Sequence, residues 1–273
     1  MKQHLLGTPI GRAALFLRDN LTIFRAAYLS PECVGTIAND QLATKLVASI
    51  CQAHKTFVDV GAHIGSVMSE VAYLDSSIKI VAIEAIPEKA ARLQRKFPFA
   101  NIHACAAGET TGQVSFFINM RKSGYSSLRR LVSSNQEEIS EITVPIRRLD
   151  DIVSPNDVDV IKIDVEGAEL GVLRGSENIF NCARPTIMFE SVETDEGNDL
   201  GYTKEALYQF LFSKEYCVLI PNRVAHNDSG LSKDGFIESH LYPRRTTNYF
   251  AIPNERRTEI RDRARSVLKI CIY

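Results

Sequence analysis

The sequence predicts an α/β fold, with a mostly parallel sheet covered by helices on both faces. Short apolar runs recur along the chain, and helix-like segments separate most of them. Glycine, proline or asparagine residues border the runs, as turns between strands and helices require. This alternation is typical of parallel sheets with crossover helices. The runs are 56–60, 79–86, 101–108, 158–164, 185–190, 216–221 and 248–253.

Residues 1–50 precede the first run and predict a helical extension. Within it, TIANDQLATKLVASI has the most helix-like pattern. Asn39 or Asp40 is the expected N-cap, because short polar side chains accept hydrogen bonds from the first amides of a helix. The opening segment lacks the long apolar core of a signal peptide, so we expect a cytoplasmic protein.

The regular alternation breaks between the third and fourth runs. GQVSFFIN, SLRRLV and ITVPIRRLDDI predict extra strands there, as a strand-rich insertion over one edge of the sheet. After the last run, a charge-rich segment predicts a C-terminal helix that is either solvated or in contact with another subunit. The expected division is an extension at 1–50, one domain at 51–254 and a helix at 255–273.

Composition argues against several classes of function. The net charge of -1 gives no electrostatic reason to expect nucleic acid or an anionic membrane as the main partner. The six cysteines are scattered without CxxC or Cys/His spacing, so a zinc site is not expected. No apolar run approaches the roughly 18 residues that a membrane span needs. We expect a protein that handles small or neutral ligands.

A glycine-containing loop, FVDVGAHIGSV, follows the first run. It places Asp59, Gly61, His63 and Gly65 at the end of a strand and the start of a helix. Glycines at this point let the backbone turn tightly and approach a ligand. The dinucleotide pattern GxGxxG is absent, and a turn that only needs positive φ would show the same glycines. His63 could contact the ligand, act as a base or face solvent.

Glu84 ends the second run, about 20 residues beyond Gly65, where an acid can accept hydrogen bonds from both hydroxyls of an adenosine ribose. The loop and the acid together predict an adenosine-containing ligand across the carboxyl ends of the strands. Asp59 suits a cationic amino-acid group better than a phosphate. This favours S-adenosylmethionine over NAD, although an NAD-dependent Rossmann oxidoreductase stays an alternative.

Five motifs together resemble the FkbM-type S-adenosylmethionine-dependent methyltransferases over roughly residues 55–253. They are FVDVGAHIG, VAIEAIPE, DVIKIDVEGAELGVLRG, RPTIMFE and NYFAIP, and the IKIDVEGAEL block is the most specific. The resemblance implies a Rossmann-like class I methyltransferase fold with a seven-stranded sheet. It also implies O-methylation of a hydroxyl on a sugar, glycan or natural product.

The resemblance further implies roles for single residues in cofactor binding. Asp59, Gly61 and Gly65 would line the methionine part of S-adenosyl-L-methionine. Glu84 would hold the ribose, and Ala106 would lie near the adenine. All of these positions lie near or just beyond the carboxyl ends of expected strands, so they would meet at one edge of the sheet.

The fourth run carries acids at its carboxyl end. The resemblance implies that Asp164 and Glu166 stand at the methyl-transfer site, where a hydroxyl needs a positioned base or a metal. Lys162 is expected to pair with Asp164 and keep it ionised. Glu169 is expected to be a helix-start acid favoured by the helix dipole. Glu190 ends the next run and is a candidate for substrate contact.

Asp164, Glu166 and Glu190 could together bind a divalent cation through oxygen ligands, although no metal is otherwise expected. Tyr125, Ser126 and Ser127 in SGYSSL could hydrogen-bond a polyol acceptor, or form a turn without function.

The expected partner is a small-molecule or glycan acceptor, with no nucleic acid and no membrane span. A homodimer is one of the oligomeric states left open. An S-adenosylmethionine-binding module without catalysis is a further alternative to the enzyme.

Overall fold

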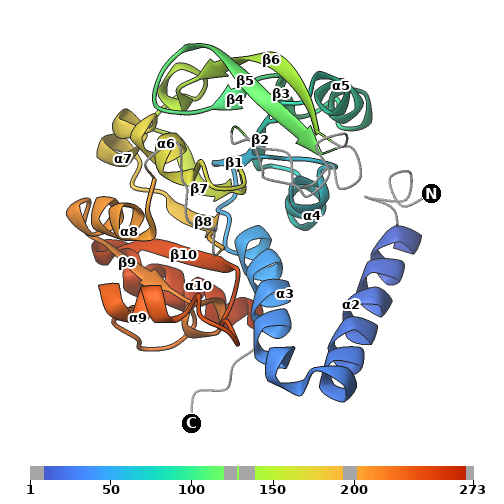
Figure 1. Cartoon of the computed structure of the whole chain (residues 1–273), viewed down its shortest axis with the longest axis vertical. Coiled ribbons are helices and arrows are strands. Elements are labelled where there is room, and N and C mark those ends of the chain that lie inside the picture. The colour runs from blue at the N-terminus through green and yellow to red at the C-terminus, as the bar shows by residue number, and fades with distance from the viewer. Residues whose placement is uncertain (1–8, 120–127, 129–138, 193–201, 269–273) are drawn as a thin grey trace.

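A seven-stranded, mostly parallel sheet forms the centre of the molecule in this computed structural model, which describes residues 9–119, 128, 139–192 and 202–268 (Figure 1). Its strands are β1 (Thr56–Val60), β2 (Lys79–Ile83), β3 (Asn101–His103), β7 (Val158–Ile163), β8 (Thr186–Glu190), β9 (Tyr216–Leu219) and β10 (Asn248–Pro253). Their order is β3-β2-β1-β7-β8-β10-β9. The pairs from β3 to β8 are parallel, whereas β10 runs antiparallel to both of its neighbours. The predicted fold class is confirmed.

Helices cover both faces of this sheet, which explains why its central strands are apolar throughout and not alternating. The helices are α2 (Pro9–Leu29), α3 (Val34–Ser49), α4 (Ser66–Leu74), α5 (Pro87–Lys96), α6 (Glu169–Arg174), α7 (Glu177–Cys182), α8 (Lys204–Ser213), α9 (Lys233–Glu238) and α10 (Arg257–Leu268). Short 3₁₀ turns are η1 (Pro31–Cys33), η3 (Leu149–Asp151), η4 (Pro221–Arg223) and η5 (Asn254–Arg256). Apolar residues of α6 to α9 form the core on one face, and those of α3, α4, α5 and α10 form it on the other. No helix in the described ranges combines the length and apolarity of a membrane span.

A second, three-stranded sheet confirms the strand-rich insertion before the fourth strand of the main sheet. It contains β4 (Ala106–Ala107), β5 (Gly112–Asn119) and β6 (Ile139–Arg147) in the order β4-β6-β5. The third run, predicted as one strand, is therefore divided, because β3 pairs with β2 while β4 turns to pair with β6. Of the predicted strand SLRRLV, only Leu128 lies within the described residues.

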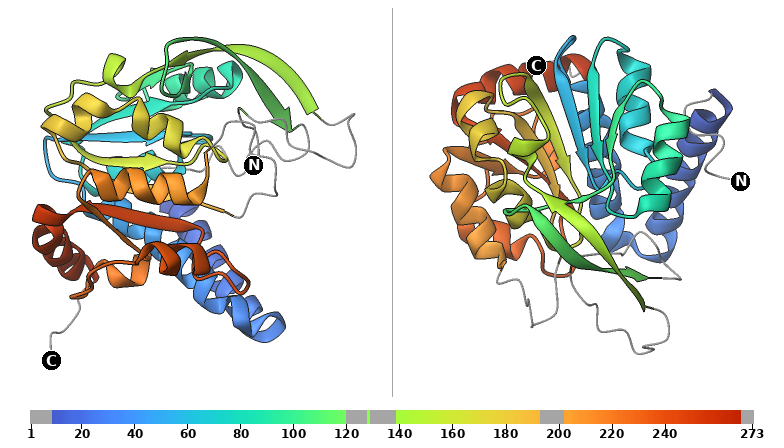
Figure 2. Two further views of the ribbon diagram at one scale, coloured as in Figure 1. Left: turned by 60° about the vertical axis from the view of Figure 1, so that its left-hand side comes forward. Right: turned by 90° about the horizontal axis from the view of Figure 1, so that it is seen from above.

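The N-terminal helices form a hairpin that projects from the molecule near the end opposite the small sheet (Figure 2). Asn39 and Asp40 do not cap α3 as predicted, because the helix already begins at Val34. Their side chains instead bind the segment that enters β10. Asp40 accepts hydrogen bonds from the Thr246 hydroxyl (2.7 Å) and the Thr247 amide (2.8 Å), and the Asn39 side chain donates to a neighbouring carbonyl.

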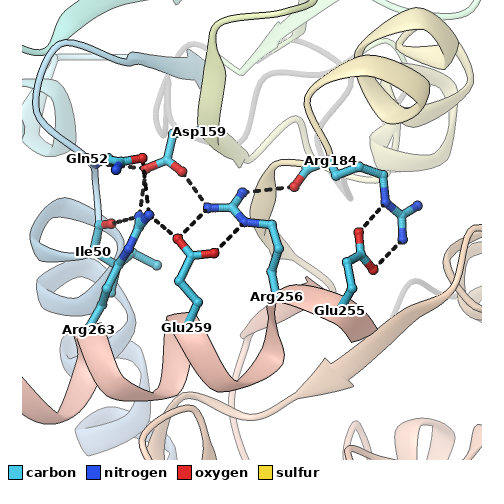
Figure 3. A network of polar contacts seen from close by, with 8 residues as sticks. All are labelled: Ile50, Gln52, Asp159, Arg184, Glu255, Arg256, Glu259 and Arg263. Atoms are coloured by element: carbon cyan, nitrogen blue, oxygen red, sulfur yellow. Dashed lines mark hydrogen bonds and ion pairs between the residues drawn. The ribbon is translucent and has the colours of Figure 1, made fainter.

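The C-terminal helix α10 packs on the sheet through its inner face, while Thr258, Glu259 and Asp262 on its outer face are exposed, in line with the predicted solvated face. Ile260 and Ala264 on its inner face are fully buried. Arg256 and Arg263 reach from α10 and the turn before it to Asp159 at the start of β7, as Figure 3 shows. The arginines that suggested a solvated face are thus largely used for this internal attachment.

Candidate active site

A cavity of about 390 Å³ lies at the carboxyl ends of β1, β2, β7 and β8, with the small sheet along one side. The sequence-predicted residues among its lining are Asp59, Gly61, His63, Glu84, Ala106, Asp164, Glu166 and Glu190. The candidates Tyr125, Ser126 and Ser127 lie outside the described residues. The motifs that are far apart in the sequence therefore meet at one edge of the sheet.

Two glycines shape the loop after β1, and they do so in different ways. Both have positive φ, 76° at Gly61 and 78° at Gly65. A side chain at Gly61 would collide with the backbone carbonyl of Asp164, so this glycine lets the ends of β1 and β7 touch. Gly65 instead packs against Leu93 and Phe97 of the α5 region and does not line the cavity, which differs from its expected place beside the cofactor.

Glu84 is buried and held by backbone amides. One of its oxygens accepts a hydrogen bond from the His63 amide (2.8 Å) and the other from the Ile86 amide (3.0 Å). Burial raises the pKa of Glu84, although these amides and Lys89 oppose the shift. The carboxyl is therefore fixed in orientation at the cavity wall.

The His63 side chain is also held in place. Its Nδ1 lies 2.8 Å from Lys89 Nζ, and burial followed by the Lys89 charge lowers its pKa. A neutral ring that accepts a hydrogen bond from the ammonium satisfies both observations. His63 also has a φ of 51°, so its backbone adopts a conformation that non-glycine residues seldom occupy.

Lys162 is a buried ammonium between two aspartates. Its Nζ lies 3.2 Å from Asp59 Oδ1 and 3.3 Å from Asp164 Oδ2, and it donates a hydrogen bond to the Gly61 carbonyl (2.8 Å). Burial alone would lower the pKa of Lys162, but Asp164 and Asp59 outweigh this effect and hold the pKa above its ordinary value. The predicted pair of Lys162 with Asp164 is present, and Asp59 shares the same cation.

Asp59 is only 1% exposed, and its close partner among the described residues is Lys162, 3.2 Å from Oδ1, since the contact of Asp59 with the Met68 amide does not reach the geometry of a well-formed hydrogen bond. Burial raises its pKa, with Lys162 acting in the opposite direction. Buried carboxylates are normally satisfied by several donors, so an oxygen without one is an unusual and costly feature. A donor group that enters the cavity would satisfy it.

Three acids converge beyond the end of β7. Asp164, Glu166 and Glu190 each place one carboxylate oxygen so that all three lie within 4.8 Å of one another. Like charges this close cannot all be ionised without a cation. Oxygens in such a set can bind a divalent cation, or they can share protons.

The pKa values of the three acids separate widely. Burial raises the pKa of Asp164, but Lys162 and a hydrogen bond from Glu190 outweigh it and lower the pKa below its ordinary value. Burial and then Asp164 raise the pKa of Glu166 to about 7. Burial, followed by Asp164 and Glu166, raises the pKa of Glu190 to about 10. At neutral pH Asp164 is ionised, Glu190 is protonated and Glu166 titrates.

Glu169 stabilises the turn between β7 and α6 through hydrogen bonds from backbone amides of the turn. Its Oε1 accepts hydrogen bonds from the amides of Val165 (3.3 Å) and Gly167 (3.1 Å), and it opens α6 as predicted. Burial raises its pKa to about 7 despite these amides. Within the turn, Glu166 has a φ of 54°. Glu169 thus holds a strained turn that presents Glu166 to the cavity.

Several cavity residues had not been predicted. Asn248 begins β10, and because this strand is antiparallel its first residue lies at the carboxyl edge of its neighbours, opposite Glu190. Thr44 comes from α3 in the N-terminal extension. Ile86 and Phe116 form an apolar wall together with Ala106. Asn248 and Ile86 had a usable signal, namely their places at the borders of predicted strands.

Comparisons with known proteins agree with this geometry. The Methyltransferase FkbM domain family matches residues 59–218, more than half of the chain. "Methyltransferase 1" of Beauveria bassiana (strain ARSEF 2860) is 28% identical over 144 residues, which are 44% of this chain and 58% of that protein. The matched region thus spans less than two thirds of that relative.

Two solved methyltransferase structures are more distant. The precorrin-6y C5,15-methyltransferase of Geobacter metallireducens GS-15 is 19% identical with a TM-score of 0.36, covering 65% of this chain and 72% of that chain. The plantazolicin methyltransferase BpumL, crystallised with a pentazolic desmethylPZN analog and SAH, is 11% identical with a TM-score of 0.39, covering 93% and 95%.

Proposed function

The chain belongs to the FkbM methyltransferase family, and from this premise we propose that it methylates a hydroxyl group of a sugar, glycan or natural-product acceptor. It is an S-adenosylmethionine-dependent methyltransferase. The observation that carries the O-methylation proposal is the acid set of Asp164, Glu166 and Glu190 at the cavity, with its widely separated pKa values. A hydroxyl acceptor must lose a proton, and such a set can orient it and accept that proton.

The cavity residues fit S-adenosylmethionine. Asp59, whose one close partner in the described part of the chain is Lys162, would accept hydrogen bonds from the ammonium of the methionine part. Glu84 would accept the ribose hydroxyls on lone pairs that its amide partners leave unused. The apolar wall of Ile86, Ala106 and Phe116 would flank the adenine. When bound, this cofactor supplies a methyl group activated by its positive sulfur.

The acids at the ends of β7 and β8 would have different roles toward the acceptor. Asp164, ionised and fixed by Lys162, would accept a hydrogen bond from the acceptor hydroxyl and orient it. Glu166 has a pKa of about 7, which suits a group that takes up a proton near neutral pH. Protonated Glu190 would donate to Asp164 and hold it in place.

Titration calorimetry tests the cofactor assignment. The purified protein should bind S-adenosylmethionine, and Glu84→Ala should weaken binding about 10- to 100-fold, because hydrogen bonds to a charged group contribute about 1.5–3 kcal/mol each. Glu109→Ala on the exposed surface is the control and should bind normally. Binding of NAD without binding of S-adenosylmethionine would support the oxidoreductase instead.

Turnover tests the acceptor class. Labelled S-adenosylmethionine, incubated with the protein and fractions of free sugars, glycans and natural products, should label an acceptor at oxygen, as mass spectrometry of the product will show. Label on nitrogen or carbon would contradict the O-methylation. Cofactor binding without labelling in any fraction would favour the non-catalytic module.

A further inference from the structure

Thr44 and Asn248 are the cavity-lining residues of the described chain that lie outside residues 59–218, the part that matches the FkbM methyltransferase family. Thr44 lies on α3 in the N-terminal extension, and Asn248 begins β10, near the other end of the chain. The matched region therefore assigns no role to either residue, although both contribute to the cavity wall.

The strand order places Asn248 on the opposite side of the acid set from the cofactor residues. Asp59 and Glu84 lie at the ends of β1 and β2. Asp164 and Glu190 lie at the ends of β7 and β8, and Asn248 comes next, because β10 adjoins β8 and pairs its first residue with Glu190. Neighbouring strands are about 4.8 Å apart, so β10 lies about 10 Å from β7 and roughly 14 Å from β1. Asn248 is therefore on the acceptor side of the cavity.

Asp40 of α3 fixes both the backbone and the side chain of Asn248. Asp40 Oδ1 accepts hydrogen bonds from the amides of Thr247 (2.8 Å) and Asn248 (3.3 Å). The Asn248 side-chain nitrogen donates to Thr247 Oγ1 (3.0 Å) and, at a longer distance, to Asp40 Oδ1 (3.4 Å). Both hydrogens of this amide are used, while its Oδ1 has no hydrogen bond to any residue that the structure describes. An amide oxygen is an acceptor, so Asn248 offers a lone pair to a ligand.

Thr44 offers a second acceptor beside the first. It lies four residues after Asp40, and residues at this spacing are neighbours on one face of a helix. The Thr44 hydroxyl donates to the Asp40 carbonyl (3.4 Å), which uses its hydrogen and leaves its lone pairs available. The wall formed by Thr44 and Asn248 therefore suits a ligand that donates hydrogen bonds.

We propose that Asn248 and Thr44 form the acceptor subsite of this enzyme, in which Asn248 accepts a hydrogen bond from a second hydroxyl of the ring that is methylated. Because this second hydroxyl is defined relative to the one that Asp164 orients, the subsite rests on the proposed O-methylation. The two strand spacings from β7 to β10 match one sugar ring that is hydrogen-bonded at both sides. Asp40 does not touch the acceptor and is a positioning residue. The acceptor class that fits is a ring polyol.

The charges near Asn248 favour a neutral polyol over one that carries a phosphate or a carboxylate. In the described ranges, the lysines that line the cavity are Lys89 and Lys162. Lys162 lies between two aspartates, and Lys89 comes from α5, which follows β2 on the cofactor side. The arginines at positions 244 and 245 precede Asn248 but do not line the cavity. An anionic group beside Asn248 would meet the carboxylates of Asp40 and Asp164, and like charges weaken binding.

Turnover of defined sugars tests the acceptor class. The probes are the methyl glycosides of glucose, galactose and mannose, together with their 6-phosphates, each incubated with labelled S-adenosylmethionine. At least one glycoside should be labelled at oxygen, and its 6-phosphate at least about 10-fold more slowly. Labelling of no glycoside, or faster labelling of the 6-phosphates, would overturn the proposal. If natural-product fractions were then labelled at oxygen, the O-methylation itself would stand, whereas label on nitrogen or carbon there would contradict it.

Removal of one hydroxyl at a time identifies the contact. The monodeoxy forms of the labelled glycoside should include one whose KM is raised about 3- to 10-fold with little change in kcat, as expected when one neutral hydrogen bond is lost in binding. Asn248→Ala should raise the KM of the parent glycoside by a similar factor. With that deoxy sugar the variant should cause no further increase, because the hydroxyl and the amide act as one pair.

Further variants separate contact from positioning. Asp40→Ala should raise KM as Asn248→Ala does, whereas Asp40→Asn keeps a side-chain oxygen and should retain most of the acceptor affinity. Thr44→Val should raise KM about 2- to 5-fold, and Thr44→Ser, which keeps the hydroxyl, should not. Asn254→Ala is the matched control, because this exposed asparagine lies just beyond the opposite end of β10, and it should behave as wild type.

Calorimetric titration of each variant with S-adenosylmethionine separates acceptor binding from cofactor binding. Affinity for the cofactor should stay within about twofold of wild type. An unchanged KM in Asn248→Ala, or additive losses from this variant and the deoxy sugar, would overturn the proposal. A loss of cofactor affinity as large as the rise in KM would also overturn it, because Asn248 would then belong to the cofactor site.

Discussion

Asp59 and Asp159 are buried aspartates on neighbouring strands, but they lie at opposite ends of the sheet and differ in their partners. Asp159, 4% exposed at the start of β7, accepts hydrogen bonds from the Gln52 amide (2.7 Å), Arg256 (2.7 Å) and Arg263 (3.0 Å) (Figure 3). Asp59, at the carboxyl end of β1, has one close partner among the described residues, the Lys162 ammonium at 3.2 Å.

The difference between the partners of the two aspartates matches two roles, attachment of a helix at one end of the sheet and ligand binding at the other. At the amino end of the strands, charge is fully matched within the chain and fixes α10 to the sheet. At the carboxyl end, acids are crowded and incompletely matched, as expected where a ligand completes the set. The same residue type thus serves stability at one edge and function at the other.

The largest effect expected is on stability at the amino end. Asp159→Ala leaves two arginines without their buried acid and should lower the free energy of unfolding by about 3–5 kcal/mol. Asp59→Asn should lower it less, by about 1.5–3 kcal/mol, since it removes one buried contact to Lys162 while Asp164 still balances that cation. Urea denaturation of both variants measures the contrast. Equal losses would mean that the two ends do not differ in this way.

The next effect concerns turnover at the carboxyl end. Asp164→Ala should reduce turnover about 10²- to 10⁴-fold, because the acceptor hydroxyl loses its orienting acid. Cofactor affinity, measured by calorimetry, should change little. Glu259→Gln in the amino-end network is the control and should leave turnover per folded molecule unchanged. Full activity in Asp164→Ala would remove this acid from the proposed mechanism.

A smaller effect is expected on the pH profile. With a pKa of about 7, Glu166 is protonated and unable to accept a proton below that pH, so kcat/KM should rise as pH increases through 7. Glu166→Gln should lower the plateau and abolish this rise. Glu169→Gln is a matched control, because Glu169 has the same pKa of about 7 but lies beneath the turn. If the rise vanishes in the control instead, Glu169 is the titrating group.

The smallest effect is expected from metal removal. Lys162 and the proton on Glu190 already reduce the negative charge of the three acids, so dialysis against EDTA should leave turnover unchanged. Added Mg²⁺ should then have no effect either. A loss that Mg²⁺ restores would show that Asp164, Glu166 and Glu190 hold a cation at the ligand end.

Local patterns in the sequence predicted the parallel strands and most of the acids at their ends. The strands can be recognised in the sequence because burial on both faces requires continuous apolar residues. The acids can be recognised because they interrupt or end these apolar runs. Glu84 and Asp164 were found in this way.

The remaining cavity residues could not be predicted from the sequence, because tertiary packing brings them to the site. Thr44 and Phe116 reach the cavity only because α3 and the small sheet pack beside it. Asn248 does so because β10 runs antiparallel. The unmatched state of Asp59 likewise follows from which donors the fold brings near, and no spacing in the sequence reveals it.

The antiparallel strand β10 also has a consequence for synthesis of the protein. It lies between β8 and β9, and its first residue, Asn248, lines the same cavity as Thr44, from a part of the chain made about 200 residues earlier. A nascent chain without residues 248–253 therefore lacks the strand that joins β9 to the sheet and the cavity residue Asn248. The cavity wall at Asn248 is therefore the last part of the cavity to be made.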